Sequence, residues 1–284
     1  MLDASQYELL DFGDGRKLEQ FGGYLLDRPC PAAEGIARKR PDSWGRALAR
    51  YDRTRGELGQ WTIRAPLPEP WTISHGGLRL ALKPTEFGHV GVFPEQAENW
   101  HWIAEQIRRA ARPPSVLNLF AYTGASTLVA AVGGAAVTHV DAAQSTVNWA
   151  RQNAELSSLG DAPIRWIAED ALKFARREIK RGHSYDAVIL DPPSYGHGPH
   201  GEIWKLTEHL PELLALCAQL TAGAPEFMLL TCHTAGIGPR ELKEFLVNAI
   251  EPKTEFNIEL GELSLTTNDH RSLNSGSFAR IARR

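Results

Sequence analysis

Short apolar runs that end in an acidic residue alternate with amphipathic stretches through the middle of the chain. The run at 116–119 leads into a tight turn that closes at Gly124, and three further runs end near Asp141, Asp170 and Asp191. The segments between them carry apolar residues at helical spacing. Strands that alternate with helices of this length predict βαβ units on a parallel sheet. Because ligands bind outside the carboxyl ends of such strands, we expect the three acids to line one ligand-binding edge.

The same pattern predicts how this sheet is completed. A buried run at 227–232 predicts a fifth strand, and Pro239 marks the start of a further helix. Two alternating runs, at 257–265 and 277–281, predict closing strands that pair antiparallel because they lie so near each other in the chain. The predicted fold class is therefore α/β, with a Rossmann-like, mostly parallel sheet of seven strands that ends in an antiparallel edge pair.

Residues 1–85 follow a different pattern. Their short aromatic and aliphatic runs are broken by Gly-Asp-Gly at 13–15 and Gly-Gly at 22–23, which is typical of hairpins. We expect a small β-rich N-terminal domain in this part of the chain. A connecting loop and helix would follow at 86–112, and the Rossmann-like domain would occupy 113–284.

Composition narrows the class of protein. The 284 residues include 31 Lys and Arg against 34 Asp and Glu, which is typical of an ordinary soluble globular chain. No apolar run reaches 18 residues and no charged segment leads into an apolar one at the start, so we expect neither a membrane span nor a secretory signal. The three cysteines, Cys30, Cys217 and Cys232, lack metal-ligand spacing. They favour a reduced, cytoplasmic protein without a metal site.

One stretch departs from the overall net charge of −3. Residues 28–55 contain eight Lys or Arg and three acids, together with Trp44 and Tyr51. Two interpretations stay open. The stretch is either a phosphate-contacting face with stacking aromatic rings, or a solvated helix or loop with one buried tryptophan.

The turn after the first strand bears on the cofactor. A dinucleotide requires the G-x-G-x-x-G fingerprint, whereas Phe120 to Gly124 offers a single glycine. A ligand with an amino acid end and a ribose, but no phosphate, needs only one close backbone approach, and S-adenosylmethionine is such a ligand. Asp141 suits its ribose hydroxyls and Asp170 its adenine amine. The alternative is that each acid caps the helix that follows it.

The fourth strand ends in Asp191-Pro192-Pro193-Ser194-Tyr195. Proline lacks a backbone donor, so we expect the Pro192 carbonyl to point outward as an acceptor beside the Asp191 carboxylate. These acceptors would hold a planar amine while Tyr195 stacks on the ring that bears it. We therefore predict Asp191, Pro192 and Tyr195 as catalytic residues. The alternative is a turn that closes a strand, with Tyr195 packed in the core.

With VLNLFAYTG, VTHVD, AEDALKF and VILDPPSYG in place, the chain resembles class I S-adenosylmethionine-dependent methyltransferases. More narrowly, it is similar to the large-subunit ribosomal RNA methyltransferase group, in which a small N-terminal domain precedes the Rossmann-like domain. That group's Phe-Leu-Asp-Gln run has a counterpart in the FPEQ segment at 93–96. The resemblance implies S-adenosylmethionine as cofactor and ribosomal RNA as partner and substrate. It implies cofactor-binding roles for Phe93, Gln96, Asn118, Phe120, Ala121, Tyr122, Thr123, Gly124, Asp141, Ala142, Asp170, Ala171 and Asp191.

The resemblance has a departure that bears on the methylated atom. Members that methylate carbon 5 of cytosine need a cysteine thiolate, two residues before the glycine that follows the fifth strand. That glycine is Gly236 here, so the position holds Thr234, while Cys232 lies two residues earlier. We therefore expect a base nitrogen as the target, with cytosine carbon 5 as second choice. A methyltransferase for small molecules or proteins, and a catalytically silent RNA-binding factor, remain alternatives. The missing glycines disfavour a nicotinamide oxidoreductase.

Histidines follow the Asp-Pro-Pro motif in a glycine-rich segment at 196–210. We expect a lid loop over the acceptor, and we consider His197 and His200 as candidate general bases.

Overall fold

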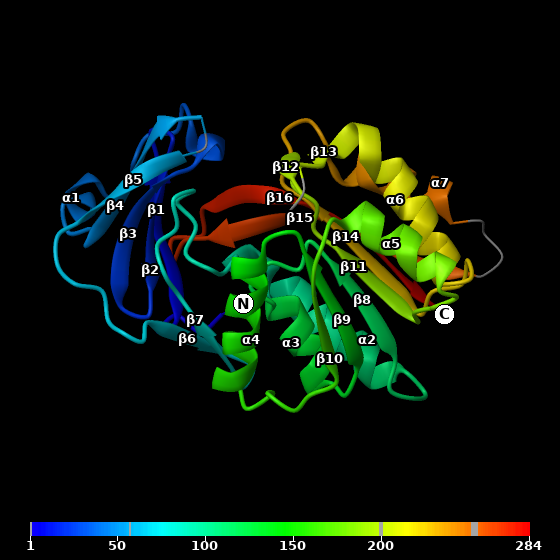
Figure 1. Ribbon diagram of the computed structural model, residues 1–284. Helices are drawn as coiled ribbons and strands as arrows, with labels where there is room; N and C mark the ends of the chain where they lie inside the picture. The colour runs from blue at the N-terminus through cyan, green and yellow to red at the C-terminus, as the bar shows by residue number, and fades with distance from the viewer. Residues whose placement is uncertain (1, 57, 199–200, 251–254) are drawn as a thin grey trace. The chain divides into compact units, whose positions relative to one another are not determined.

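The computed structural model describes residues 2–56, 58–198, 201–250 and 255–284 (Figure 1). By its internal contacts the chain divides into two compact units. The first unit comprises Met1–Glu98 and Ser264–Ser275, and the second comprises Asn99–Leu263 and Gly276–Arg284. The boundaries predicted after residues 85 and 112 stay predictions. The contacts assign residues 86–98 and 264–275 to the first unit as well.

The second unit is built on a seven-stranded sheet with the order β10-β9-β8-β11-β14-β16-β15 (Figure 1). The pairs from β10 through β14 are parallel, and β16 is antiparallel to β14, which confirms the predicted fold class. The strands are β8 (Ser115–Leu119), β9 (Ala136–Asp141), β10 (Ile164–Ala168), β11 (Ala187–Leu190), β14 (Phe227–Cys232), β15 (Phe256–Thr266) and β16 (Ser272–Arg283).

Helices cover both faces of this sheet, as Figure 1 shows. They are α2 (Ala97–Arg109), α3 (Ala125–Val132), α4 (Gln144–Leu156), α5 (Ala171–Lys180), α6 (Leu206–Leu220) and α7 (Pro239–Ala249). On β8, Leu117 packs in the core shared with α5, α6 and α7, whereas Val116 packs in the core shared with α2 and α3. Neighbouring residues of a strand thus serve opposite cores. Burial on both faces explains the near-continuous apolar runs in the sequence.

The first unit is β-rich, as predicted. Its main sheet has the order β1-β2-β3-β4-β5, and a separate pair, β6 and β7, lies outside it. The strands are β1 (Tyr7–Gly13), β2 (Arg16–Phe21), β3 (Tyr24–Pro29), β4 (Ala49–Arg55), β5 (Leu58–Ile63), β6 (Thr72–His75) and β7 (Leu78–Ala81). The described residues of this unit also form the one-turn helices η1 (Pro31–Ala33), α1 (Pro41–Trp44) and η2 (Pro94–Gln96).

The tip of the β15–β16 hairpin belongs to the first unit. Thr267 forms a parallel bridge with Leu9 of β1. Arg271 donates to Asp11 over 2.6 Å, and Lys39 pairs with Asp269 over 2.9 Å. Residues more than 200 positions apart in the chain thereby stabilise one small sheet.

The basic stretch at 28–55 is not a helix or loop throughout, because its last part forms β4. Ala49 and Tyr51 are buried while Arg50 is exposed, which is the alternation of a strand. Trp44 is buried too, and its indole nitrogen donates to Asp11 over 2.9 Å. Two buried rings offer no stacking surface, so of the two interpretations left open for this stretch, the face with stacking aromatic rings does not hold.

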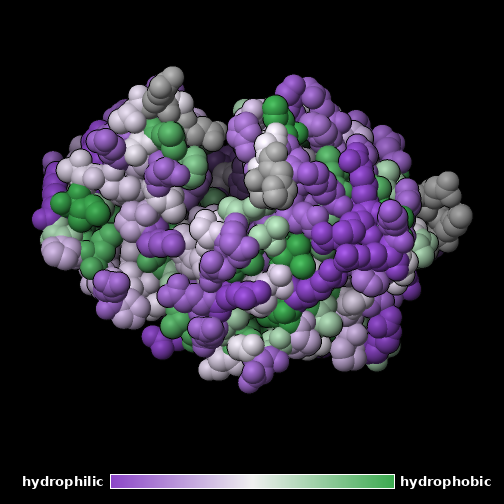
Figure 2. All heavy atoms as spheres, viewed as in Figure 1, coloured by the Kyte–Doolittle hydropathy of each residue, from purple (hydrophilic) through white to green (hydrophobic). Residues whose placement is uncertain are grey.

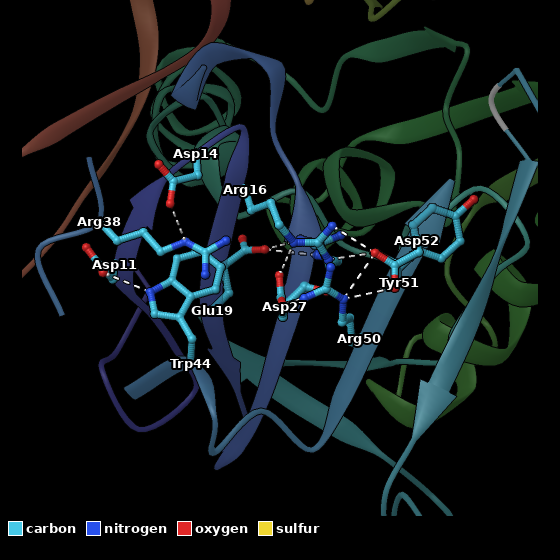
Figure 3. Close-up of polar contacts among 11 residues, drawn as sticks. Asp11, Asp14, Arg16, Glu19, Asp27, Arg38, Trp44, Arg50, Tyr51 and Asp52 are labelled. Atoms are coloured by element: carbon cyan, nitrogen blue, oxygen red, sulfur yellow. Dashed lines mark hydrogen bonds and ion pairs between the residues drawn. The ribbon is translucent and has the colours of Figure 1, made fainter. Parts of the chain in front are cut away.

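Several of its cations are also engaged within the unit, as Figure 3 shows. Arg28 is buried and donates to Glu19 over 2.6 Å, and the Arg38 guanidinium lies 3.9 Å from the centre of the Trp44 ring. Arg50 pairs with Asp27 on β3 and with Asp52 on its own strand. The pairs of Arg28 and Arg50 hold neighbouring strands together, so part of the positive charge in this stretch serves the fold.

The predicted lid loop is a two-stranded hairpin. Its strands are β12 (Tyr195–His197) and β13 (Ile203–Lys205), paired antiparallel. His197 lies on β12, whereas His200 lies outside the described residues. In the part of the chain that the structure describes, no helix is long and apolar enough to cross a membrane.

Charged pairs are prominent on the surface of α5. Hydrophilic residues gather over this part of the molecule in Figure 2. Lys173 pairs with Glu202, and Arg176 pairs with Glu212. Exposed pairs of this kind contribute about 0–1 kcal/mol each. We expect a larger contribution to stability from the buried carboxylate of Glu178 on the same helix.

Glu178 of α5 is a fully buried carboxylate that three side chains surround. Arg165 and Tyr185 donate to it over 2.8 Å, and the His183 ring lies at the same distance. These hydrogen bonds outweigh the effect of burial and lower the pKa of Glu178 to about 2. A depressed pKa adds stability above about pH 4.5, and this contribution is lost as the pH falls from there toward 2.

We predict that Glu178→Gln lowers the free energy of unfolding by about 3 kcal/mol at pH 7. The difference from the wild type should shrink as the pH falls below about 4.5, because the Glu178 carboxyl group of the unfolded chain is then protonated while that of the folded protein stays ionised down to about pH 2. Urea denaturation at pH 7, 5 and 4 measures it. Glu212→Gln, at an exposed pair on α6, is the matched control and should cost under about 1 kcal/mol. Equal losses in both variants would contradict the prediction.

Candidate active site at the carboxyl ends of the parallel strands

The order of the sheet reverses between β8 and β11. From β8 the chain proceeds through β9 and β10 on one side, whereas β11 and β14 lie on the other. Leu119 pairs with Leu190 at the carboxyl ends of these two strands. Phe120 and Asp191 therefore both begin their loops at the switch point, where open α/β sheets bind ligands.

The turn after β8 has an unusual backbone. Phe120, Tyr122 and Gly124 have φ of 55°, 49° and 90°. A left-handed backbone at a residue other than glycine costs on the order of 1–3 kcal/mol and persists where the surroundings enforce it. The Ala121 N–H donates to the Val140 carbonyl over 3.0 Å. Neighbouring strands thus fix the shape of the turn.

Two side chains hold the same turn. The Asn153 amide donates to the Thr123 carbonyl over 2.9 Å, and the Tyr122 N–H donates to Asp141 over 2.9 Å. The other oxygen of Asp141 accepts the Ala143 N–H over 3.0 Å. Burial raises the pKa of Asp141, and these two hydrogen bonds lower it in part. Since Ala143 is the N-cap of α4, Asp141 is not simply the cap of the next helix.

Asp170 caps the helix that follows it, as the alternative interpretation of the three acids predicts. It is the N-cap of α5, and its Oδ1 accepts the Lys173 N–H over 2.9 Å. The carboxyl group is largely buried at the end of β10. A carboxylate has acceptor sites on both oxygens, so capping and ligand contact are compatible.

Asn118 lies in a buried polar network beneath the turn. Its amide donates to Thr127 of α3 over 2.9 Å, and Thr127 lies 2.9 Å from Nδ1 of His139. Burial holds the pKa of His139 down at about 3, so its imidazole is neutral near pH 7. The network ties the start of α3 to β8 and β9.

The other predicted residues on the cofactor side lie in two places. Ala142 follows Asp141 and is half-buried, while Ala171 is the buried first residue of α5. Phe93 and Gln96 belong to the first unit, at the N-cap and the end of η2. Phe93 packs edge-on against His89 with ring centres 5.2 Å apart.

On the acceptor side, Asp191 is held from the neighbouring strand β14. The Thr231 hydroxyl donates to Oδ1 of Asp191 over 2.5 Å, and Nε2 of His233 lies 3.4 Å from the same oxygen. Pro192 is buried. The carbonyl of Pro193 accepts a hydrogen bond from the Trp204 indole over 2.7 Å.

Tyr195 is not packed in the core. Its side chain lies on β12, and the residue is 49% exposed. On the opposite face of the hairpin, Trp204 is buried and contacts the Phe120 ring with centres 4.8 Å apart. The hairpin therefore packs against the cofactor-side turn and leaves Tyr195 facing solvent.

The cysteine at the end of β14 is enclosed. Cys232 is 1% exposed, and its sulfur accepts the Thr234 N–H over 3.4 Å. The Thr234 hydroxyl lies 2.6 Å from that of Ser194. The thiol is thus part of the interior, as expected for a buried cysteine at a strand end.

Thr231 and His233 were not predicted from the sequence, and neither was the role of Trp204 as an anchor. A signal was present, because β14 was expected to be a parallel strand. The residues at its carboxyl end had to reach the same edge as Asp191.

Comparison with known proteins agrees with this geometry. A family model for S-adenosylmethionine-dependent methyltransferases matches residues 34–256. The chain belongs to this family. An S-adenosylmethionine-dependent methyltransferase from Agrobacterium tumefaciens has a solved structure with a TM-score of 0.92. It is 37% identical, and the match covers 99% of this chain and 92% of that one.

Two curated relatives are named as ribosomal RNA enzymes. Ribosomal RNA large subunit methyltransferase I of Aeromonas salmonicida is 27% identical over 203 residues, which is 71% of this chain. Ribosomal RNA large subunit methyltransferase K/L of Ectopseudomonas mendocina is 30% identical over 210 residues, which is 70% of this chain. The chain spans 50% of the first and 26% of the second. The predicted family, enzyme class and cofactor are confirmed.

The residues at the switch point fit S-adenosylmethionine. Among the described residues no side chain caps α3, so the first turn of this helix offers backbone N–H groups suited to a carboxylate. Each oxygen of Asp141 accepts one backbone N–H and has a further lone pair for a hydroxyl group.

Proposed function

We propose that this protein transfers a methyl group from S-adenosylmethionine to a nitrogen of an RNA base, with ribosomal RNA as the substrate. One observation carries the proposal: Asp191 is held at the end of β11, and an exposed tyrosine follows four residues later. An anchored carboxylate and an exposed ring are the two groups that recognise an amine on an unstacked base. The names of the curated relatives supply the class of RNA.

On the cofactor side, we assign the amino acid end to the turn and the start of α3. The Asp141 carboxylate accepts hydrogen bonds from the ribose hydroxyls. The Asp170 carboxylate accepts a hydrogen bond from the adenine amine while it also caps α5. Asn118 acts through Thr127 by fixing α3. Within the second unit, the set proposed for this side is Asn118, Phe120, Ala121, Tyr122, Thr123, Gly124, Asp141, Ala142, Asp170 and Ala171.

On the acceptor side, the chemistry is mostly positioning. The acceptor nitrogen gains the methyl group and gives up one proton, while the sulfur keeps the bonding electrons and leaves as S-adenosylhomocysteine. Asp191 accepts a hydrogen bond from the amine and so directs the nitrogen lone pair. Pro192 makes the chain after Asp191 rigid, and Tyr195 stacks on the base.

The surroundings of Cys232 favour nitrogen over cytosine carbon 5. Attack on carbon 6 requires an accessible thiolate, whereas this thiol is almost fully buried. The position two residues before Gly236 carries the Thr234 hydroxyl, which contacts Ser194. Neither residue presents a thiolate to a base.

A small-molecule or protein substrate is the second candidate. The internal ion pairs of the first unit favour it, because they leave few basic side chains for phosphates. Labelled methyl transfer to ribosomal RNA from a strain that lacks the protein separates the two candidates. A silent RNA-binding factor would bind that RNA and give no labelled product.

For the cofactor side, Gly124→Ala is the sharpest test. Gly124 has φ of +90°, and a Cβ there would lie 3.0 Å from Cβ of Ala150. We predict that the variant binds S-adenosylhomocysteine at least about tenfold more weakly, because the turn must shift away from α4. Isothermal titration calorimetry measures the change.

Gly134→Ala is the matched control for this variant. Its φ of +92° is similar, but nothing lies within 4 Å of the added Cβ. It should lose about 1–2 kcal/mol of stability and keep its affinity. Adding Ala150→Gly to Gly124→Ala should recover much of the binding by relieving the contact. Equal affinities in the two alanine variants would argue against a ligand at this turn.

For the acceptor side, we predict that Asp191→Ala lowers kcat by at least about 100-fold and keeps donor affinity within about threefold. Tyr195→Ala should lower kcat/KM for RNA by about 10- to 100-fold, and Tyr195→Phe should retain it, because stacking needs only the ring. Single-turnover transfer of a labelled methyl group, with mass spectrometry of the nucleosides, gives these values. Normal methylation of RNA by Asp191→Ala would refute the assigned role.

A further inference from the structure

Two polar side chains, one at the end of β14 and one just beyond it, converge on one oxygen of Asp191. β11 and β14 are parallel with Leu190 opposite Leu230, so Thr231 lies beside Asp191. His233 is the first residue after β14, which ends at Cys232. Both reach Oδ1 of the carboxylate, at 2.5 Å and 3.4 Å.

The Thr231 hydroxyl lies close to the Asp191 carboxylate in a buried position. It is 2% exposed, and its hydroxyl also lies 3.4 Å from the Leu190 carbonyl. A hydroxyl carries one proton, and the short contact to the carboxylate shows where that proton goes. The Thr231 side chain is therefore oriented toward Asp191.

The place of His233 depends on a glycine in the neighbouring strand β16. At Gly276 the φ is +144°, and a Cβ there would lie 2.8 Å from Nδ1 of His233 and 2.7 Å from the Cys232 carbonyl. Any other residue at 276 would press on both the imidazole and the backbone. The His233 side chain is 34% exposed, so the ring sits in this gap with one edge toward solvent.

We infer that Thr231 and His233 are positioning residues that act through Asp191. Rotation about the last side-chain bond of an aspartate is broad and roughly two-fold, so one contact alone fixes the carboxylate poorly. The Thr231 hydroxyl and the His233 ring together hold Oδ1 and thereby set the direction in which Oδ2 points. This inference rests on the proposed function, in which Asp191 receives the N–H of the acceptor.

The arrangement also describes the acceptor. A carboxylate that presents one oxygen from a fixed plane matches a single N–H in the plane of a ring, as in an exocyclic amine. A cationic guanidinium frequently binds both oxygens in a bidentate contact. The contacts of Thr231 and His233 with Oδ1 thus favour a neutral heteroaromatic amine over an arginine side chain as substrate.

The test compares four variants with the wild type. His233→Ala and Thr231→Val should each lower kcat for RNA about tenfold and leave the KM and Kd for S-adenosylmethionine within about twofold. His233→Gln and Thr231→Ser keep a hydrogen-bond donor and should recover activity to within about threefold of the wild type. His101→Ala, at an exposed histidine on α2, is the matched control and should behave as the wild type.

A double-mutant cycle separates positioning from general structural damage. In an Asp191→Ala background, His233→Ala and Thr231→Val should have almost no further effect on kcat, because the carboxylate that they contact is gone. Additive losses in that background, or wild-type kcat in both single variants, would overturn the inference. The inference would also be overturned if the loss of activity paralleled a loss of melting temperature and the variants His233→Gln and Thr231→Ser did not recover activity.

The activity of the wild type keeps the two proposals apart. An active wild type with unaffected variants removes only the positioning role. A wild type that binds the donor but methylates no ribosomal RNA removes the proposed function, and the inference falls with it.

Discussion

The register of the parallel strands is the constraint on which this molecule depends. Because β8, β9 and β11 pair residue by residue with Leu119 beside both Val140 and Leu190, their carboxyl ends lie at one level. Side chains that are 50 residues apart in the chain are brought to one edge without any contact of their own. The site needs no cluster in the sequence, since the sheet supplies the convergence.

Hydrogen bonds from neighbouring strands and helices fix the groups at this edge of the sheet. A turn with three left-handed residues would relax in isolation, and here Val140, Asp141 and Asn153 each bind one of its backbone groups. The acceptor side is built in the same manner, since Asp191 is held from β14. In both cases a group at a strand end is oriented by the neighbouring strand or helix, which is how a fold preorganises a site.

The sequence allowed the layout of the second unit to be predicted because its information is periodic. Apolar runs of four to six residues that end in acids are readable without a structure, and so is the single glycine at 124. Thr231 and His233 were missed because a threonine and a histidine after an apolar run carry no pattern by themselves. They become conspicuous only when β14 is placed beside β11.

The first unit was harder for a different physical reason. The stretch that ends in β4 is rich in arginine, and charge says little about secondary structure when ion partners are unknown. Asp27 lies on β3, 23 positions earlier, and it converts Arg50 from a solvated charge into a cross-strand contact. The burial of Trp44 likewise depends on Asp11, which lies 33 residues away. Such long-range pairings leave no local trace.

These pairings also limit how RNA can be held. A guanidinium that is buried against a carboxylate, as Arg28 is against Glu19, contacts a phosphate only if that pair breaks, at a cost of about 3–5 kcal/mol. The candidates for phosphate contact are therefore exposed cations such as Arg40, Arg46 and Arg53. Each phosphate neutralised on a single strand contributes about −0.7 to the slope of log affinity against log salt. If RNA is the substrate, as proposed, a few such contacts imply a shallow salt dependence of binding. The choice among substrates would then depend mainly on the Asp191 carboxylate and the exposed Tyr195 ring.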